Sequence, residues 1–195
     1  MLCVQCCTGG SVDMAVRSLF FYCSLPLLVF GALNSGDITA KKFLIQACPQ
    51  GWVAYQECCY LFENRTMSLP MAEKRCSLSG STLFVANSDK EFHFVSRLTA
   101  RNLLSWIGLA QFEQQDTPVW QTTSGIDPIK MKWLVNPFSA SGNGWSAASK
   151  CVAYLNSDAE SARYLYFYPC DSLFQSVCER NLTFNSALAR QAGSL

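Results

Sequence analysis

Six cysteines arranged around the tetrapeptide Trp106-Ile107-Gly108-Leu109 constrain the fold of this chain more than any other feature of its sequence. Three precede the tetrapeptide and three follow it: Cys48, Cys59, Cys76, Cys151, Cys170 and Cys178. The chain has eleven cysteines in 195 residues, which is typical of oxidising compartments and unusual in the cytosol. The pattern predicts a disulfide-stabilised extracellular domain with a tryptophan-centred strand through its middle. It also indicates binding rather than catalysis.

The amino-terminal segment supports an extracellular location. No charged residue occurs from Ser18 to Gly36, Arg17 precedes this apolar stretch, and small residues follow it. This order predicts a leader at residues 1–36 with a signal peptide at about 14–36, and therefore a secreted protein. The alternative is an uncleaved anchor, since nineteen uncharged residues can just span a bilayer. Only in that case do we expect a membrane association, as a single-pass protein with an extracellular domain.

Charge and motif content argue against several function classes. The 15 basic and 14 acidic residues give a formal net charge of +1, so electrostatics provide no reason to expect nucleic acid as a partner. The single histidine, His93, has no partner signature, and we expect a surface or satisfied helical histidine. The sequence has no glycine-rich phosphate loop and no histidine–glutamate zinc motif. We therefore expect no catalytic residue, no metal and no cofactor.

The order of short patterns predicts a mixed α+β domain. Aromatic and β-branched runs at 52–55 and 59–62 predict a strand pair. A first helix is expected from Pro70 to Ser79, and Ser88 with Glu91 forms a capping box that predicts the start of a second helix. Further strands are expected at 105–109, 151–155, 164–168 and 176–178. Residues 111–150 are rich in turn formers and predict a long loop that its tryptophans fasten to the core.

An ordered set of residues resembles the long-form C-type lectin-like domain. Its parts are Cys48-Pro49-Gln50-Gly51-Trp52, Cys59-Tyr60-Leu61-Phe62, Trp106-Ile107-Gly108-Leu109, Cys151-Val152 and Cys178-Glu179. The resemblance places the domain at residues 48–180, after a connector at 37–47 and before a flexible polar tail at 181–195. It implies an α+β fold with two helices, antiparallel strands and a long irregular loop that carries ligand binding. Tryptophans 106, 120 and 133 are expected in the core.

The disulfide pairing follows from this resemblance, because six cysteines alone allow fifteen connectivities. The resemblance implies three bridges: Cys48–Cys59, Cys76–Cys178 and Cys151–Cys170. Cys58 is then left over within the domain. A leftover cysteine in a secreted domain suggests a disulfide-linked homodimer or a free thiol.

Many members of this family bind sugars through calcium, a hard cation that needs six to eight oxygen ligands. The family pattern has an acid or amide, a proline and an asparagine soon after the loop tryptophan, and a Trp-Asn-Asp triplet before the penultimate cysteine. This chain has Asn136-Pro137-Phe138 in the first place and Leu165-Tyr166-Phe167 in the second. No carboxylate lies between Asp127 and Asp158. The sequence therefore predicts that calcium-dependent sugar binding is absent.

Aromatic residues of the loop and the following strand are the candidate ligand contacts. Trp145 is expected either as a packed loop anchor or as a ligand contact. Tyrosines 164, 166 and 168 alternate and so share one face of a strand, which lies either in the core or in an exposed patch. The candidate contacts are Trp145, Tyr164, Tyr166 and Phe167. Asn64 and Asn181 begin N-glycosylation sequences at expected surface positions.

These observations favour a non-catalytic extracellular recognition module that binds a protein or glycan independently of calcium. One alternative is a calcium-dependent lectin with an atypical site. A second is a redox enzyme that uses Cys58. A third is a structural module or truncated product of a larger membrane protein, because residues 95–98 faintly resemble the lectin module of polycystin-type proteins.

Overall fold

The structure of this chain is a computed structural model, and it describes residues 48–182. The predicted leader at 1–36, the connector at 37–47 and residues 183–195 of the predicted tail lie outside the described residues. Within residues 48–182, no helix is long and apolar enough to cross a membrane.

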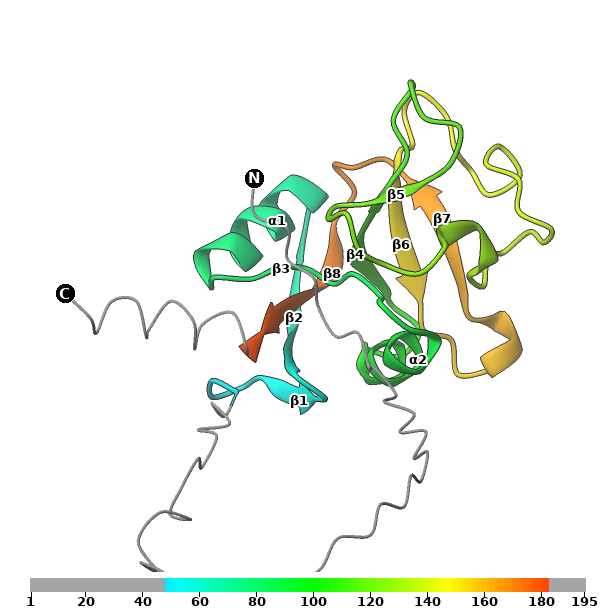
Figure 1. Cartoon of the computed structure of the whole chain (residues 1–195). Helices are drawn as coiled ribbons and strands as arrows, with labels where there is room; N and C mark the ends of the chain where they lie inside the picture. The colour runs from blue at the N-terminus through cyan, green and yellow to red at the C-terminus, as the bar shows by residue number, and fades with distance from the viewer. Residues whose placement is uncertain (1–47, 183–195) are drawn as a thin grey trace, which may run out of the picture. The chain divides into compact units, whose positions relative to one another are not determined.

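The described residues form the expected mixture of helices and strands (Figure 1). The described residues contain two α-helices, α1 (Leu69–Leu78) and α2 (Asp89–Leu98). The strands are β1 (Val53–Tyr55), β2 (Cys58–Met67), β3 (Thr82–Leu83), β4 (Leu104–Ala110), β5 (Val119–Trp120), β6 (Cys151–Leu155), β7 (Tyr164–Tyr168) and β8 (Phe174–Asn181). Two short 3₁₀ helices, η1 (Pro128–Lys130) and η2 (Glu160–Ala162), lie in the connections.

Local sequence signals explain where the two helices begin and end. Pro70 lies in the first turn of α1, where its missing N–H costs nothing, and Gly80 after the helix has a φ of 65°. At α2, the Ser88 hydroxyl accepts the N–H of Glu91 at 3.2 Å, which confirms the predicted hydroxyl cap. The carboxylate of Glu91 accepts the N–H of Asn87 at 2.6 Å, while its other oxygen faces the protein interior.

The strands form one eight-stranded sheet in the order β1-β2-β8-β4-β6-β7, with β3 paired to β8 and β5 paired to β4. All described strand pairs are antiparallel except β4 and β8, in which Trp106 lies beside Ser176. This parallel pair joins the two halves of the sheet. It places the predicted Trp106 strand at the centre of the domain.

Two hydrophobic clusters form the core, and each involves a different helix. One contains Trp106, the first-helix residues Leu69, Ala72 and Cys76, and the closing Cys178. The other contains Val95 of α2 together with Trp120 and Trp133. The prediction that tryptophans 106, 120 and 133 are core residues is confirmed, since their exposed fractions are 0%, 8% and 1%. In β4, a Cβ at Gly108 would lie 3.1 Å from the Phe84 carbonyl oxygen, closer than ordinary van der Waals contact, so a larger residue there would push the neighbouring backbone away by a few tenths of an ångström.

Three disulfides connect these elements, and all three implied pairings are confirmed. Cys48 is bonded to Cys59 in the amino-terminal hairpin. Cys151 is bonded to Cys170 at the base of the long loop. The bridge between Cys76 of α1 and Cys178 of β8 spans 102 residues and joins the first helix to the last strand.

The structure also departs from the expected elements at two places. The pairing of β3 with β8 at Leu83 and Cys178 was not expected from the sequence. Strand β8 begins at Phe174, two residues earlier than expected, and continues to Asn181. Asn181, which was expected to begin the flexible tail, is therefore part of the sheet. Asn181 is paired with Cys58 of β2, and this pairing extends the sheet beyond the last disulfide.

Candidate functional site

The long loop between β4 and β6 is the candidate recognition site, and Trp133 fixes its base to the sheet. The indole N–H of Trp133 donates to the Pro128 carbonyl at 2.8 Å, and its ring stacks on Phe167 with 5.1 Å between centroids. Phe138 packs against the same ring from within the loop at 4.9 Å. A buried indole with a satisfied N–H combines a large apolar contact with a directional bond. It therefore holds the middle of the loop in one position.

Backbone hydrogen bonds extend this attachment. The N–H of Leu165 in β7 donates to the Lys132 carbonyl at 2.9 Å, and the N–H of Leu134 donates to the Leu165 carbonyl at 3.2 Å. The side chain of Asn143 is fully buried, and it accepts the N–H of Val135 at 2.8 Å and donates to the Val135 carbonyl at 3.0 Å. The two arms of the loop are thus joined to each other and to an edge strand. Such a loop presents a defined surface without needing a bound ion.

Trp145 also anchors the loop. Its indole N–H donates to the Gln111 carbonyl at 2.9 Å, and its partly buried ring packs against the core. Of the two roles expected for Trp145, this geometry favours the packed loop anchor. The next residue back, Gly144, has a φ of 86°, and a Cβ there would lie 2.3 Å from the Tyr166 ring. The loop can approach β7 this closely only because residue 144 is glycine.

The exposed stretch of the loop after Trp133 is largely apolar and carries no charge. Leu134 and Val135 are 52% and 40% exposed, and Asn136 and Pro137 after them are exposed as well. No charged residue occurs between Lys132 and Lys150. We call residues 134–138 the loop surface. Large aliphatic side chains held in the open on a fixed backbone are typical of a binding surface.

The aromatic strand β7 separates the candidate contacts into two groups. Tyrosines 164, 166 and 168 share one face, as their alternation predicted, and they are half-buried, while Leu165 and Phe167 point into the core. Phe167 is 1% exposed and lies beneath Trp133, so its prediction as a ligand contact was wrong. Neighbouring tyrosines on the open face meet edge to face at 6.4 Å and 5.4 Å. This face is therefore neither fully core nor fully exposed.

The residues at the implied calcium positions do not fit a calcium ion. Tyr166 and Phe167 stand where the family pattern has asparagine and aspartate, and neither offers a carboxylate or amide oxygen; Phe167 is also buried. In the loop, Phe138 stands where the family pattern has asparagine. The side-chain amide nitrogen of Asn136 donates to the Trp133 carbonyl at 2.8 Å. The oxygen and the nitrogen of the Asn143 side-chain amide both form hydrogen bonds with the loop backbone. One exposed amide is too few for a cation that takes six to eight oxygens.

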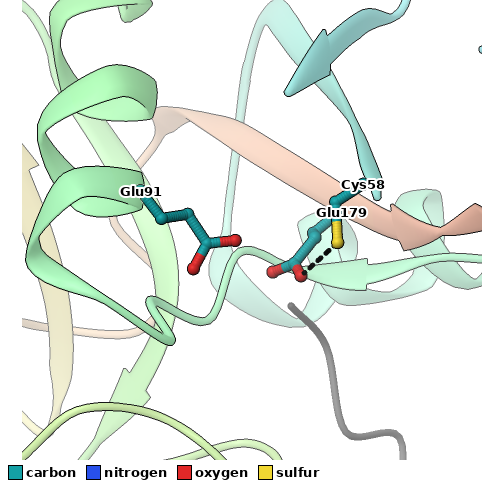
Figure 2. A group of neighbouring side chains, drawn as sticks. All are labelled: Cys58, Glu91 and Glu179. Carbon is teal, nitrogen blue, oxygen red and sulfur yellow. Dashed lines mark hydrogen bonds between the residues drawn. The ribbon is translucent and has the colours of Figure 1, made fainter. Parts of the chain in front are cut away.

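A second site of chemical interest lies in the interior between α2, β2 and β8. Cys58, Glu91 and Glu179 are all buried, and their sulfur and oxygen atoms lie within 4.8 Å of one another (Figure 2). The Tyr60 hydroxyl donates to Glu91, and the N–H of Val85 donates to the Glu179 carboxylate at 3.0 Å. Cys58 Sγ lies 3.6 Å from the other Glu179 oxygen. These contacts join α2 to strands β2 and β8 through polar groups.

The state of Cys58 bears on the two roles expected for it. Cys58 is disulfide-bonded, and none of the three bridges among residues 48–182 includes it. The free thiol expected for Cys58 was therefore wrong, and its sulfur, already bonded and 0% exposed, is not placed to bridge two chains. A bonded sulfur is also a poor metal ligand, since metals bind the thiolate.

The buried carboxyl of Glu91 predicts a pH-dependent stability. Burial raises its pKa, although hydrogen bonds from Tyr60 and from the backbone act in the opposite direction. The folded state therefore keeps this proton to a higher pH than the unfolded state, so the Glu91 contribution to stability falls as the pH rises through and above its ordinary value of 4.5. We expect the Glu91→Gln variant to gain stability relative to the parent between pH 4.5 and 7, measured by urea unfolding.

The parent protein is the control for this comparison, because it shares every other residue of the cluster with the variant. Glu179, Tyr60 and Cys58 face Glu91 and are present in both proteins, so they contribute equally to both curves. Glutamine can accept the Asn87 N–H through its oxygen and donate to the Tyr60 oxygen, which preserves the contacts. Parallel stability curves for the two proteins would contradict the role of the Glu91 proton.

The remaining sequence candidates lie apart from the loop. Asn64 is exposed in β2, as an N-glycosylation acceptor must be. Asn181 is 8% exposed and lies in β8, so the expectation of a surface position there was wrong. His93 is exposed on α2, which agrees with the predicted surface histidine.

Comparison with known proteins identifies the family. Residues 65–180 match the Lectin C-type domain. C-type lectin domain-containing protein 91 of Caenorhabditis elegans is 42% identical over 146 residues, covering 72% of this chain and 65% of that protein. Protein 88 of the same series is 42% identical over 147 residues, covering 72% of this chain and 64% of its own length. The chain therefore belongs to the C-type lectin domain family, which is non-catalytic, and the redox-enzyme alternative is set aside.

Solved structures agree on the fold. The carbohydrate-recognition domain of the mouse scavenger receptor C-type lectin superposes with a TM-score of 0.58 at 23% identity, covering 69% of this chain and 98% of that domain. At that identity the likeness shows the α+β C-type lectin fold. The chain spans slightly less than two thirds of the length of the two nematode relatives.

Sequence reasoning missed the buried cluster and the role of Asn143. Glu91 was predicted as part of a helix cap, a surface role, and Glu179 only as the residue after the last cysteine. Cys58 was singled out as spare, but nothing in its spacing placed it beside two glutamates. One signal was available for Asn143, because an amide between two glycines often hydrogen-bonds backbone in a tight turn.

Proposed function

We propose that this chain is an extracellular recognition module that binds a protein or glycan partner through its long loop, independently of calcium. The observation that carries the proposal is the loop surface, residues 134–138, which is exposed, uncharged and attached to the sheet by Trp133 and Asn143. Leu134 and Val135 supply aliphatic contact area. Because their backbone is already ordered, a partner binds them at little cost in loop entropy.

The chemistry of the loop supports independence from calcium. A calcium-bridged sugar needs carboxylate and amide oxygens from the protein, and the matching positions here hold Phe138, Tyr166 and Phe167. An apolar, uncharged surface suits a protein partner or the apolar face of a sugar ring. A calcium-dependent lectin with an atypical site remains the alternative, and its oxygen ligands would have to lie elsewhere.

Secretion and modification complete the proposal. The apolar stretch at residues 18–36 supports export, with a single-pass anchor as the alternative. In an oxidising compartment the disulfides persist, and Asn64 is exposed for N-glycosylation.

The decisive experiment is a binding screen of the secreted chain against cells and glycans, with and without a calcium chelator. We expect binding that persists in chelator and falls at least about tenfold in Leu134→Asp, because a charge placed in an apolar contact must be desolvated. Leu78→Asp is the matched control, since Leu78 is 75% exposed on α1 and lies outside the loop surface. Protease or glycosidase treatment of the cells distinguishes protein from glycan partners.

Calcium itself is the second readout. We expect millimolar calcium to leave the melting temperature of the full chain unchanged, because a ligand that does not bind the folded state cannot stabilise it. A clear calcium-dependent rise in melting temperature, or loss of binding in chelator, would support the calcium-dependent alternative. Equal partner binding by Leu134→Asp and Leu78→Asp would show that the loop surface is not the binding site.

A further inference from the structure

A cavity of about 220 Å³ lies apart from the loop surface, between α2, the segment around η1 and the segment around η2. Its apolar lining comes from Phe92, Met131 and Tyr154, which belong to three different parts of the chain. The ring of Tyr154 is 4% exposed and meets Phe92 edge to face at 5.4 Å. The volume is below that of typical drug-sized pockets and suits a ligand with one ring.

The polar part of this cavity has more positive than negative charge. Arg163, Lys130 and Lys132 line it, against the carboxylates of Asp89 and Glu160. The Lys132 ammonium donates to the backbone carbonyl of Glu160 at 2.6 Å. The Glu160 carboxylate is 76% exposed, so water screens its charge, and Lys130 contacts Asp127 outside the cavity at 3.4 Å.

Arg163 is the cation best placed to hold an anion. Its side chain is only 15% exposed, and its Nε donates to the Ser157 carbonyl at 2.9 Å. The nearest carboxylate oxygen, from Glu160, lies 3.7 Å from its terminal nitrogen, beyond good hydrogen-bonding distance. A guanidinium has five N–H donors arranged in a fork that matches a carboxylate. A sheltered fork beside an apolar floor favours an anion that also has an apolar body.

We propose that this cavity binds a small organic carboxylate with a ring-sized apolar body. The carboxylate pairs with Arg163 and Lys132, and the body lies on Phe92, Met131 and Tyr154. The site is independent of the loop surface, since it shares no residue with positions 134–138. It would give the domain a small-molecule ligand in addition to its macromolecular partner.

Benzoate is the probe, with neutral benzamide as its isostere and acetate as the carboxylate without a ring. By titration of the full chain followed by ¹⁵N–¹H NMR, we expect benzoate to bind with a dissociation constant of about 1 mM. Benzamide and acetate should each bind at least about fivefold more weakly. The resonances that shift should belong to α2, the η1 segment, β6 and the η2 segment with Arg163.

Arg163→Gln should weaken benzoate binding by about tenfold, the lower end expected for losing a charge-assisted hydrogen bond. Arg97→Gln is the matched control, because Arg97 is exposed on α2 and does not line the cavity. Lys132→Gln, a substitution at an exposed position, should weaken binding by about threefold. Equal binding of benzoate and benzamide, or unchanged binding in both Arg163→Gln and Lys132→Gln, would overturn the proposal, as would shifts confined to other regions.

Discussion

Removing the Cys76–Cys178 bridge by the double substitution Cys76→Ala/Cys178→Ala is expected to destabilise the domain by about 4–5 kcal/mol. The bond closes a ring across 102 residues, so its loss restores a large chain entropy to the unfolded state. Both cysteines are fully buried in the cluster around Trp106, and losing their sulfur atoms adds a packing cost. For a domain of this size the loss corresponds to a fall in melting temperature of roughly 15–20 °C, measured by calorimetry.

The amino-terminal bridge provides the matched control. Cys48 and Cys59 are separated by 11 residues, so Cys48→Ala/Cys59→Ala should cost about 3 kcal/mol on the same chain-entropy model. The long bridge should therefore produce the larger fall in melting temperature. If the two double variants melt at the same temperature, the ring across α1 and β8 contributes less than its length implies.

The Trp133→Ala variant is expected to lose about 3–5 kcal/mol and to lose partner binding as well. Trp133 is 1% exposed, it stacks on Phe167, and its indole donates to the Pro128 carbonyl. Replacing such a residue with alanine leaves a cavity and an unsatisfied carbonyl. Because Trp133 also fixes the base of the loop surface, binding should fall more than the amount of folded protein does. Chemical denaturation and the cell-binding assay measure the two effects separately.

Two variants in the same loop test this explanation. Trp133→Phe keeps much of the stacking but loses the hydrogen bond, so its cost should be about half that of alanine. Trp145→Ala removes a tryptophan that is only partly buried, and we expect a smaller loss of stability. If Trp145→Ala destabilises the protein as much as Trp133→Ala, the loop is not fixed chiefly at Trp133.

Much of the architecture could be predicted because its signals are local or come from an ordered pattern. The Ser88 cap depends on residues three apart, and Pro70 and Gly80 mark the ends of α1. The alternation of apolar and aromatic residues in 164–168 fixed which side chains share a face. It did not say which face is core, and Phe167 was therefore placed wrongly.

The sequence by itself predicted the family, the six cysteines of the three implied bridges and the residue types at the implied calcium positions, because each depends only on which residue types occur in which order. The tertiary structure alone decided how Cys58, Glu91 and Glu179 meet in the interior, and how Arg163 comes to share a cavity with Phe92 and Met131. These groups lie far apart in the chain. Their distances are set by the register of β2 against β8 and by the packing of α2, which no local pattern encodes.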